Sequence, residues 1–149
     1  MTTNIKTRKM QPEDKADILA MMNEFYSSDA VFTNGSAAIF ENDFQNCVND
    51  CPYLEGFVFC ENENILGYAM IAKSFSTEFG KPCIWFEDLY LKQELRGFGI
   101  VPKFIEYIKQ TYPDCVYRLE VENENKHAVH VYKKQGFKTL PYTQMYETP

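Results

Sequence analysis

Leu95-Arg96-Gly97-Phe98-Gly99-Ile100-Val101 decides how the fold of this chain is interpreted. The stretch lies between a largely apolar, strand-like segment at residues 83–91 and an amphipathic segment at residues 102–111. A glycine-rich turn between a strand and the N-terminus of a helix leaves backbone amides unpaired, and the helix dipole adds positive potential. We therefore expect this turn to bind an anion, and the natural ligand is a cofactor that carries phosphate.

Two common phosphate-binding patterns do not fit the turn. A dinucleotide fingerprint has a third glycine and lies near the start of a chain, whereas here Ile100-Val101-Pro102 follows Gly99. The lysine and serine or threonine of a P-loop do not follow it either. Taken alone, the turn is either an anion site or an ordinary tight connection.

Length and composition favour a globular protein with one domain over residues 1–149. The chain is 45% hydrophobic and 15% aromatic. It has no apolar run that would cross a membrane, and it starts without the apolar core of a signal peptide, which predicts a cytoplasmic protein. The net charge of −6 argues against nucleic acid or an anionic membrane as partner and is compatible with a small cationic substrate.

Hydrophobic periodicity predicts strands and helices in the order β-α-α-β-β-β-α-β-α-β. The expected strands cover residues 5–9, 54–60, 65–75, 83–91, 116–121 and 137–146, and the expected helices cover residues 12–26, 37–50, 102–111 and 126–135. Pro141 inside the last strand indicates an edge strand or a bulge. This order predicts one mixed α/β sheet with helices on both faces.

A second motif lies at residues 125–137. Asn125, Ala128 and Tyr132 share one face of the expected helix over about two turns. The small residue between two polar ones lets another group pack closely there. Each polar residue also has an ordinary interpretation, because Asn125 can cap the helix and Tyr132 can be a half-buried core phenol.

Together the two motifs resemble the signatures of the GNAT (Gcn5-related N-acetyltransferase) family. Arg96 to Val101 resembles the family's Arg/Gln-x-x-Gly-x-Gly/Ala pyrophosphate loop. Asn125-x-x-Ala128-x-x-x-Tyr132, followed by Gly136-Phe137, resembles its second cofactor motif. The order of elements is also that of this acyl-CoA N-acyltransferase-like fold, so the resemblance covers almost the whole chain.

The resemblance implies a binding site for acetyl-CoA. The residues expected at the pyrophosphate are Arg96, Gly97, Phe98, Gly99, Ile100 and Val101, and those expected along the pantetheine arm are Leu89, Tyr90, Leu91, Asn125 and Ala128. Tyr132 would also contact the cofactor, at its sulfur, and would protonate the departing thiolate. Val101 and Pro102 depart from the family, which usually has Gly or Ala at the last loop position, so we expect somewhat looser binding.

Acetyl transfer to an amine also requires a group that accepts the ammonium proton. Phe86 to Leu91 resembles the corresponding strand of spermidine/spermine acetyltransferases, in which the first acid of the pair serves the acceptor amine. This resemblance favours Glu87 as the base. Asp88 or a water molecule is an alternative, and Glu87 can also be an ion-paired carboxylate without a catalytic part.

In this family the first two helices, their loop and the last strand build the acceptor pocket. The candidates here are Glu24, Phe25, Tyr26, Phe32, Glu87 and Tyr142. Acids and aromatic rings suit a cation, although the same residues can be ordinary core and rim. We expect no metal, because neither His127 with His130 nor Cys47 with Cys51 has a third ligand beside it.

The resulting hypothesis is an acetyl-CoA-dependent N-acetyltransferase that acts on a primary amine of a small, polyamine-like or amino-acid-like molecule. The amine would attack the thioester directly, and amides near residues 89–91 would stabilise the oxyanion. The alternative is a non-catalytic acyl-CoA-binding sensor or interaction protein on the same fold, and a dinucleotide or nucleotide enzyme is a third class. Exposed aromatic residues and the last strand would support a homodimer.

Overall fold

The computed structural model describes residues 4–149 and is built around a five-stranded sheet in the order β1-β2-β3-β4-β5. The strands are β1 (Lys6–Lys9), β2 (Leu54–Glu61), β3 (Asn64–Ser76), β4 (Lys81–Leu91) and β5 (Val116–Leu119). Neighbours from β1 to β4 are antiparallel, whereas β5 runs parallel to β4. Because a parallel neighbour requires a crossover connection, the chain passes over one face of the sheet between β4 and β5.

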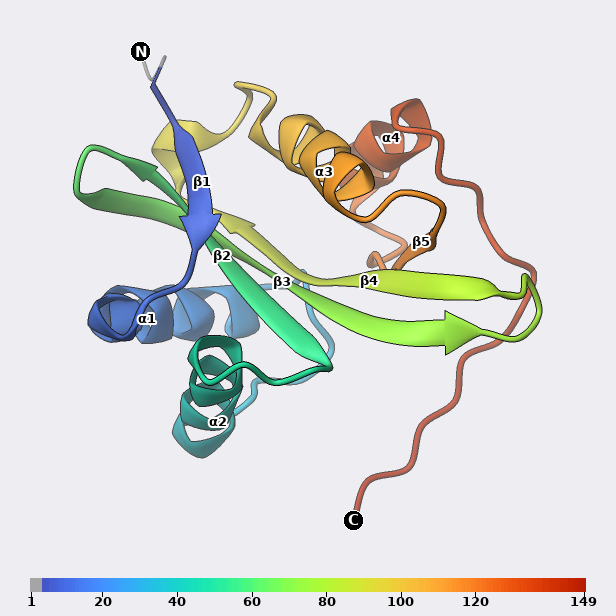
Figure 1. Cartoon of the computed structure of the whole chain (residues 1–149), viewed down its shortest axis with the longest axis horizontal. Coiled ribbons are helices and arrows are strands. Elements are labelled where there is room, and N and C mark those ends of the chain that lie inside the picture. Colours follow the sequence, from blue (N-terminus) through green and yellow to red (C-terminus); the bar gives the residue numbers. More distant parts are fainter. Residues whose placement is uncertain (1–3) are drawn as a thin grey trace.

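Helices cover both faces of this sheet, as the order of elements predicts. They are α1 (Lys15–Tyr26), α2 (Ala37–Val48), α3 (Ile100–Thr111) and α4 (Lys126–Lys134), with short 3-10 turns at Pro12–Asp14 and Gln93–Leu95. Figure 1 shows α1 and α2 on one face and α3 and α4 on the other. The mixed α/β architecture is therefore confirmed.

Each face has its own hydrophobic core. The core under α1 and α2 includes Ile18, Met21, Met22, Phe40, Phe44, Val58, Tyr68 and Met70. The core under α3 includes Phe57, Phe59, Ile71, Ile84, Phe86, Phe104, Ile105 and Ile108. The strand residues alternate between these two sets, because successive side chains of a strand point to opposite faces.

The alternation is interrupted in β4 by a bulge at Glu87. Phe86 lies opposite Ile71 and Asp88 lies opposite Met70, so Glu87 is the extra residue. Before the bulge, Phe86 points to the α3 core, whereas after it Asp88 hydrogen-bonds to tyrosines on the α1 side. An unbroken strand would have placed both side chains on one face.

The expected last strand at residues 137–146 is wrong. The C-terminal segment, which we define as residues 137–149, is extended but belongs to no strand, and it passes the turn between β3 and β4 (Figure 1). Pro141 has no N–H for a ladder, and β5 offers only the short edge Val116–Leu119. Side chains hold the segment instead: the Tyr142 hydroxyl donates to Glu78 at 2.6 Å, and the Tyr146 ring lies 5.4 Å from that of Phe32.

Candidate active site

The sheet opens between β4 and β5, and this opening is the centre of the candidate site. Their pairing ends at Phe86 and Leu119, but β4 continues to Leu91. From Glu87 onward β4 pairs with β3 alone, so within residues 4–149 its other edge has no partner strand. Such an edge presents backbone N–H and C=O groups to which an extended ligand can hydrogen-bond, and it includes the expected Leu89, Tyr90 and Leu91.

The glycine turn lies directly after this open edge. Gly97 and Gly99 have φ values of +86° and +74°, in the left-handed region that glycine adopts without strain. No hydrogen bond to residues 4–149 uses the amides of residues 97–101, and α3 begins at Ile100. A Cβ atom at either glycine would meet nothing within 4 Å. The turn therefore combines free amides, the positive end of a helix and open space, which suits a phosphate.

Arg96 and Val101 frame the turn. The Arg96 Nε atom donates to the carbonyl of Leu91 at 3.0 Å, and its guanidinium carbon lies 5.9 Å from the centre of the Tyr90 ring. Val101 is half-buried and packs against the α3 core. Its side chain is therefore held away from the open surface of the turn, so this departure from the family pattern leaves the turn accessible.

The second motif lies on α4 with the cap that its sequence predicts. Asn125 is exposed, and its Oδ1 atom accepts from the amide of Ala128 at 3.2 Å. Tyr132 is half-buried, and its ring lies 6.1 Å from that of Phe137. Burial away from water raises the pKa of Tyr132. Its hydroxyl forms no hydrogen bond with the described residues. The phenol therefore stays protonated at neutral pH and has a proton to give.

The two adjacent acids of β4 have different surroundings. Asp88 is buried, with 4% of its surface exposed, and it accepts from the hydroxyls of Tyr68 at 2.8 Å and Tyr26 at 3.0 Å. Burial raises its pKa more than these hydrogen bonds lower it. Glu87 is exposed at the bulge and accepts no hydrogen bond from the described residues. The geometry thus gives Asp88 a packing role and leaves Glu87 free to contact a substrate.

Carboxylates gather around Glu87. Partial loss of water raises its pKa, and the nearby charges of Asp88, Glu120 and Asp43 raise it further. Burial and the charge of Asp88 likewise raise the pKa of Asp43 to about 6. Like charges that crowd together favour proton uptake or a bound cation. This part of the site is therefore suited to bind a cationic group or to accept a proton.

The structure brings together most, but not all, of the expected acceptor residues. Phe25 makes edge-on contacts with the rings of Tyr26, Tyr68 and Tyr90, at centroid distances between 5.3 and 6.4 Å. Glu24 is exposed and accepts from the Tyr90 hydroxyl.

Two expected acceptor residues lie apart from this cluster. Among the aromatic residues of the described chain, Phe32 packs only against Tyr146. The Tyr142 hydroxyl donates a hydrogen bond to Glu78. No aromatic contact or hydrogen bond among the described residues joins Phe32 or Tyr142 to the cluster around Phe25, although Tyr142 lines a cavity that Tyr132 also lines.

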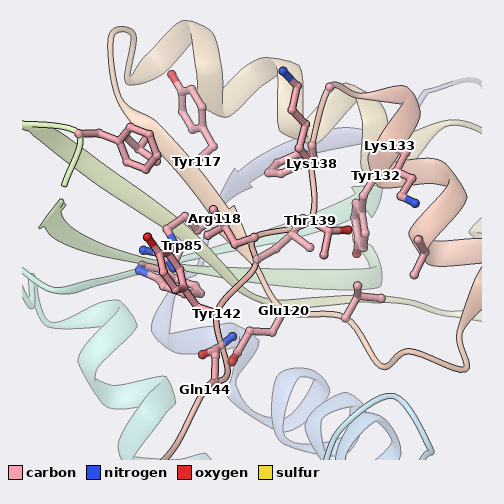
Figure 2. A pocket seen from close by; sticks show the side chains of 18 of the residues that line it. Trp85, Tyr117, Arg118, Glu120, Tyr132, Lys133, Lys138, Thr139, Tyr142 and Gln144 are labelled. Carbon is pink, nitrogen blue, oxygen red and sulfur yellow. The ribbon is translucent and has the colours of Figure 1, made fainter.

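A cavity of about 570 Å³ lies between β5, α4 and the C-terminal segment (Figure 2). Tyr132 lies on one side of it, Trp85, Arg118 and Tyr142 lie together on the other, and Glu120 lies next to Gln144. The cavity adjoins the opening between β4 and β5, because it is lined by Leu119, where the pairing of the two strands ends, and by the next residue, Glu120.

Sequence reasoning missed several residues of this site, which are Asp43, Tyr68, Trp85, Arg118 and Glu120. Asp43 carried a signal, since it falls on the apolar stripe of α2, three residues after Phe40 and next to Phe44. Tyr68 and Arg118 carried none, because their roles depend on strand pairing across the sheet.

Residues 4–149 contain no helix that is long and apolar enough to cross a membrane. The same residues hold no group of three or more His, Cys, Asp or Glu side chains placed to bind a metal ion.

Comparison with known proteins gives one family and many related folds. The acetyltransferase (GNAT) family matches residues 19–137. A curated relative, the thialysine N-epsilon-acetyltransferase of Bos taurus, is 37% identical over 79 residues, which are 51% of this chain and 46% of the relative. The chain thus matches about half the length of that protein.

Solved structures share the fold over nearly the whole chain. A possible acetyltransferase from Clostridium difficile superposes with a TM-score of 0.80 at 19% identity, over 97% of both chains. The aminoglycoside N-acetyltransferase AAC(6')-Iy, bound to the bisubstrate analogue CoA-S-monomethyl-acetylneamine, gives a TM-score of 0.77 at 14% identity, over 99% of both chains. At these identities the likeness concerns the fold alone.

Proposed function

This chain belongs to the GNAT acetyltransferase family, and we propose that it transfers the acetyl group of acetyl-CoA to a primary amine of a small molecule. One observation carries the proposal. The open edge of β4 leads at one end to the glycine turn, whose amides at residues 97–101 are unpaired. At its other end lies Glu87, with other carboxylates nearby. This edge gives a long, phosphate-bearing ligand a place next to a site that attracts a cation.

The residues at the open edge fit acetyl-CoA, which supplies the acetyl group as a thioester. The amides of residues 97–101 would hold its pyrophosphate, and α3 would add the positive end of its dipole. Residues 89–91 would pair with the pantetheine arm through their backbone, and Asn125 with Ala128 would lie along it. The free amides near Leu89 would also stabilise negative charge that develops on the carbonyl oxygen.

Two side chains would handle the protons. Glu87, directly or through a water molecule, would accept the proton of the acceptor ammonium, so that the nitrogen bonds to the acetyl carbon as the carbon–sulfur bond breaks. Tyr132 would donate its phenolic proton to the sulfur, which leaves as a thiol. The nitrogen would lose its second proton to the Tyr132 phenolate, which restores the phenol, and Glu87 would pass its proton to water. The net products are therefore an acetamide, CoA as its free thiol and one proton. The raised pKa values of both groups support these roles.

The acceptor is proposed to be cationic, and polyamine-like or amino-acid-like. The carboxylates of Asp43, Glu87, Asp88 and Glu120 and the rings of Phe25 and Tyr26 support this, because acids and aromatic faces both attract cations. The names of the related thialysine and aminoglycoside acetyltransferases agree with an amine acceptor. A cytoplasmic location, a single domain and a homodimer remain predictions from the sequence.

The direct test is an acceptor screen. Purified protein is incubated with acetyl-CoA and a panel of primary amines, free thiol is measured, and the acetylated product is identified by its mass. The proposal expects thiol release that depends on the amine, above the rate of hydrolysis without an acceptor. Binding of acetyl-CoA in calorimetry without release on any amine would favour the non-catalytic sensor instead.

A further inference from the structure

Arg118 is a cation placed on the acceptor side of the sheet. It lies on β5 directly across from Trp85 on β4, and its guanidinium stacks on the indole ring at 4.6 Å from the centroid. Phe86 and Leu119, the next residues on each strand, point to the α3 core. Arg118 and Trp85 therefore point to the opposite face, the one that also holds Asp88.

This guanidinium has no acidic partner in the described chain. Five ion pairs occur among residues 4–149, and none of them includes Arg118, although the protein carries a net charge of −6. Its side chain is half-buried and lines the 570 Å³ cavity beside Trp85 and Tyr142 (Figure 2). A stacked, half-buried guanidinium on a cavity wall keeps its donors free in a fixed fork, which matches a carboxylate.

The separation between Arg118 and Glu87 determines how long a molecule must be to contact both residues. Its partner Trp85 precedes Glu87 by two residues along β4, which is about 7 Å of strand. Glu120 connects the two places, because it lines the same cavity and, like Glu87, directly follows the last pair of the two strands, Phe86 and Leu119. A molecule with an amine beside Glu87 can thus reach Arg118 through a chain of several methylene groups.

We propose that Arg118 binds a carboxylate of the acceptor, so that the acceptor is an amino acid with a primary amine at the end of its side chain. This inference rests on the proposed acetyl transfer and makes its substrate class specific. Glu87 serves the amine, Arg118 forms two parallel hydrogen bonds to the carboxylate, and Trp85 holds the guanidinium in place. A polyamine offers Arg118 only a like charge, which disfavours it in this cavity.

The test compares three acceptors that differ in one group: L-lysine, lysine amide and 1,5-diaminopentane. Steady-state kinetics are measured for the wild type, Arg118→Gln and Arg118→Lys, with Lys134→Gln as a control that removes an exposed cation of α4 outside the cavity. The wild type is expected to prefer lysine by at least about tenfold in kcat/KM. Arg118→Gln should raise KM for lysine by about the same factor and should lower KM for 1,5-diaminopentane, because the like charge is removed. Arg118→Lys should retain part of the preference.

The outcomes separate this inference from the proposed function. Equal use of the three acceptors, or an equal effect of Arg118→Gln on all of them, would overturn the role of Arg118 while acetyl transfer stands. Absence of transfer to any amine would overturn the proposed function and this inference with it. Unchanged acetyl-CoA affinity and an unchanged melting temperature in Arg118→Gln show that the variant is folded. Calorimetry with lysine alone gives a readout without turnover, in which binding should weaken in the same variant.

Discussion

Tyr68 donates its hydroxyl to the carboxylate of Asp88 at 2.8 Å across two neighbouring strands, inside the core that α1 and α2 cover. This pair depends on the bulge at Glu87, because only the extra residue turns Asp88 toward that face. The same bulge leaves Glu87 at the open edge of β4. The bulge therefore places Asp88 in the interior of the protein and Glu87 at the candidate site.

Replacing Tyr68 with Phe removes the shorter of the two tyrosine hydrogen bonds to Asp88. Because a buried acceptor then loses a donor, the free energy of unfolding at pH 7 should fall by about 1–3 kcal/mol. Tyr53→Phe is the control, since that residue is 71% exposed and should cost less than about 0.5 kcal/mol. Urea denaturation measures both, and equal stabilities for the two variants would contradict the role of the pair.

Asp43→Asn should change how stability depends on pH. The pKa of Asp43 is raised from 3.8 to about 6 in the folded protein, so the native state holds a proton more tightly than the unfolded chain. Asp43 therefore costs stability as pH rises from about 4 to about 6, and the cost stays constant above. After allowance for partial exposure, Asp43→Asn should gain about 1 kcal/mol at pH 7.

The gain in Asp43→Asn should disappear as pH falls toward 4. Thermal melts of the wild type and the variant from pH 4 to 8 measure the difference. Asp29→Asn is the control, because that residue is exposed in the loop after α1. A constant difference between Asp43→Asn and the wild type at all pH values would contradict the assignment.

Glu55→Gln should show the opposite dependence on pH. Burial alone would raise the pKa of Glu55, but hydrogen bonds from Lys9, Tyr112 and Lys73 outweigh it and lower the pKa. A carboxyl with a lowered pKa stabilises the fold above its unfolded pKa, and this contribution is lost as pH falls through the folded value.

At pH 7 Glu55→Gln should lose about 2–4 kcal/mol, because two lysines keep their charge without the carboxylate. The loss should shrink below about pH 4. Glu63→Gln, in the exposed turn between β2 and β3, is the control. A loss that is the same at pH 3 and pH 7 would argue against the ion pairs as its cause.

Gly99→Ala should weaken cofactor binding through the shape of the turn. Gly99 has a φ of +74° with open space around it, so a methyl group meets no atom but strains the backbone by about 1 kcal/mol. Gly80→Ala is a matched control, because Gly80 has a φ of +65°, equally open space, and a place in the β3–β4 turn. Both variants should lose similar stability, but only Gly99→Ala should lower acetyl-CoA affinity in calorimetry. A parallel loss of affinity in both would show a general effect of destabilisation.

Much of the fold is predictable from the sequence, because its signals are local. The helix at residues 126–134 follows an Asn cap, and α3 follows two glycines with positive φ. The strands expected at residues 54–60 and 65–75 form the β2–β3 hairpin, each with one or two further residues at its ends. The family resemblance is confirmed by the match over residues 19–137.

The features that the sequence does not predict depend on which strand lies beside a segment, and not on the residues of the segment itself. The segment 137–146 has the aromatic residues of a strand, but it finds no complete edge beyond β5 and contains Pro141. The bulge at Glu87 exists only in the register between β3 and β4. Stacking of Arg118 on Trp85 likewise appears only when the parallel strands are aligned.

The central claim is that this chain transfers an acetyl group with Tyr132 as the acid. Tyr132→Phe keeps the ring that packs against Phe137 and removes only the hydroxyl. In single-turnover and steady-state measurements with an amine found in the acceptor screen, this variant should lose about 100-fold or more in kcat. Its affinity for acetyl-CoA should stay within about twofold of the wild type. The control is Tyr107→Phe, on the exposed side of α3, in which both kcat and the affinity for acetyl-CoA should stay within about twofold. An unchanged kcat in Tyr132→Phe would contradict the account.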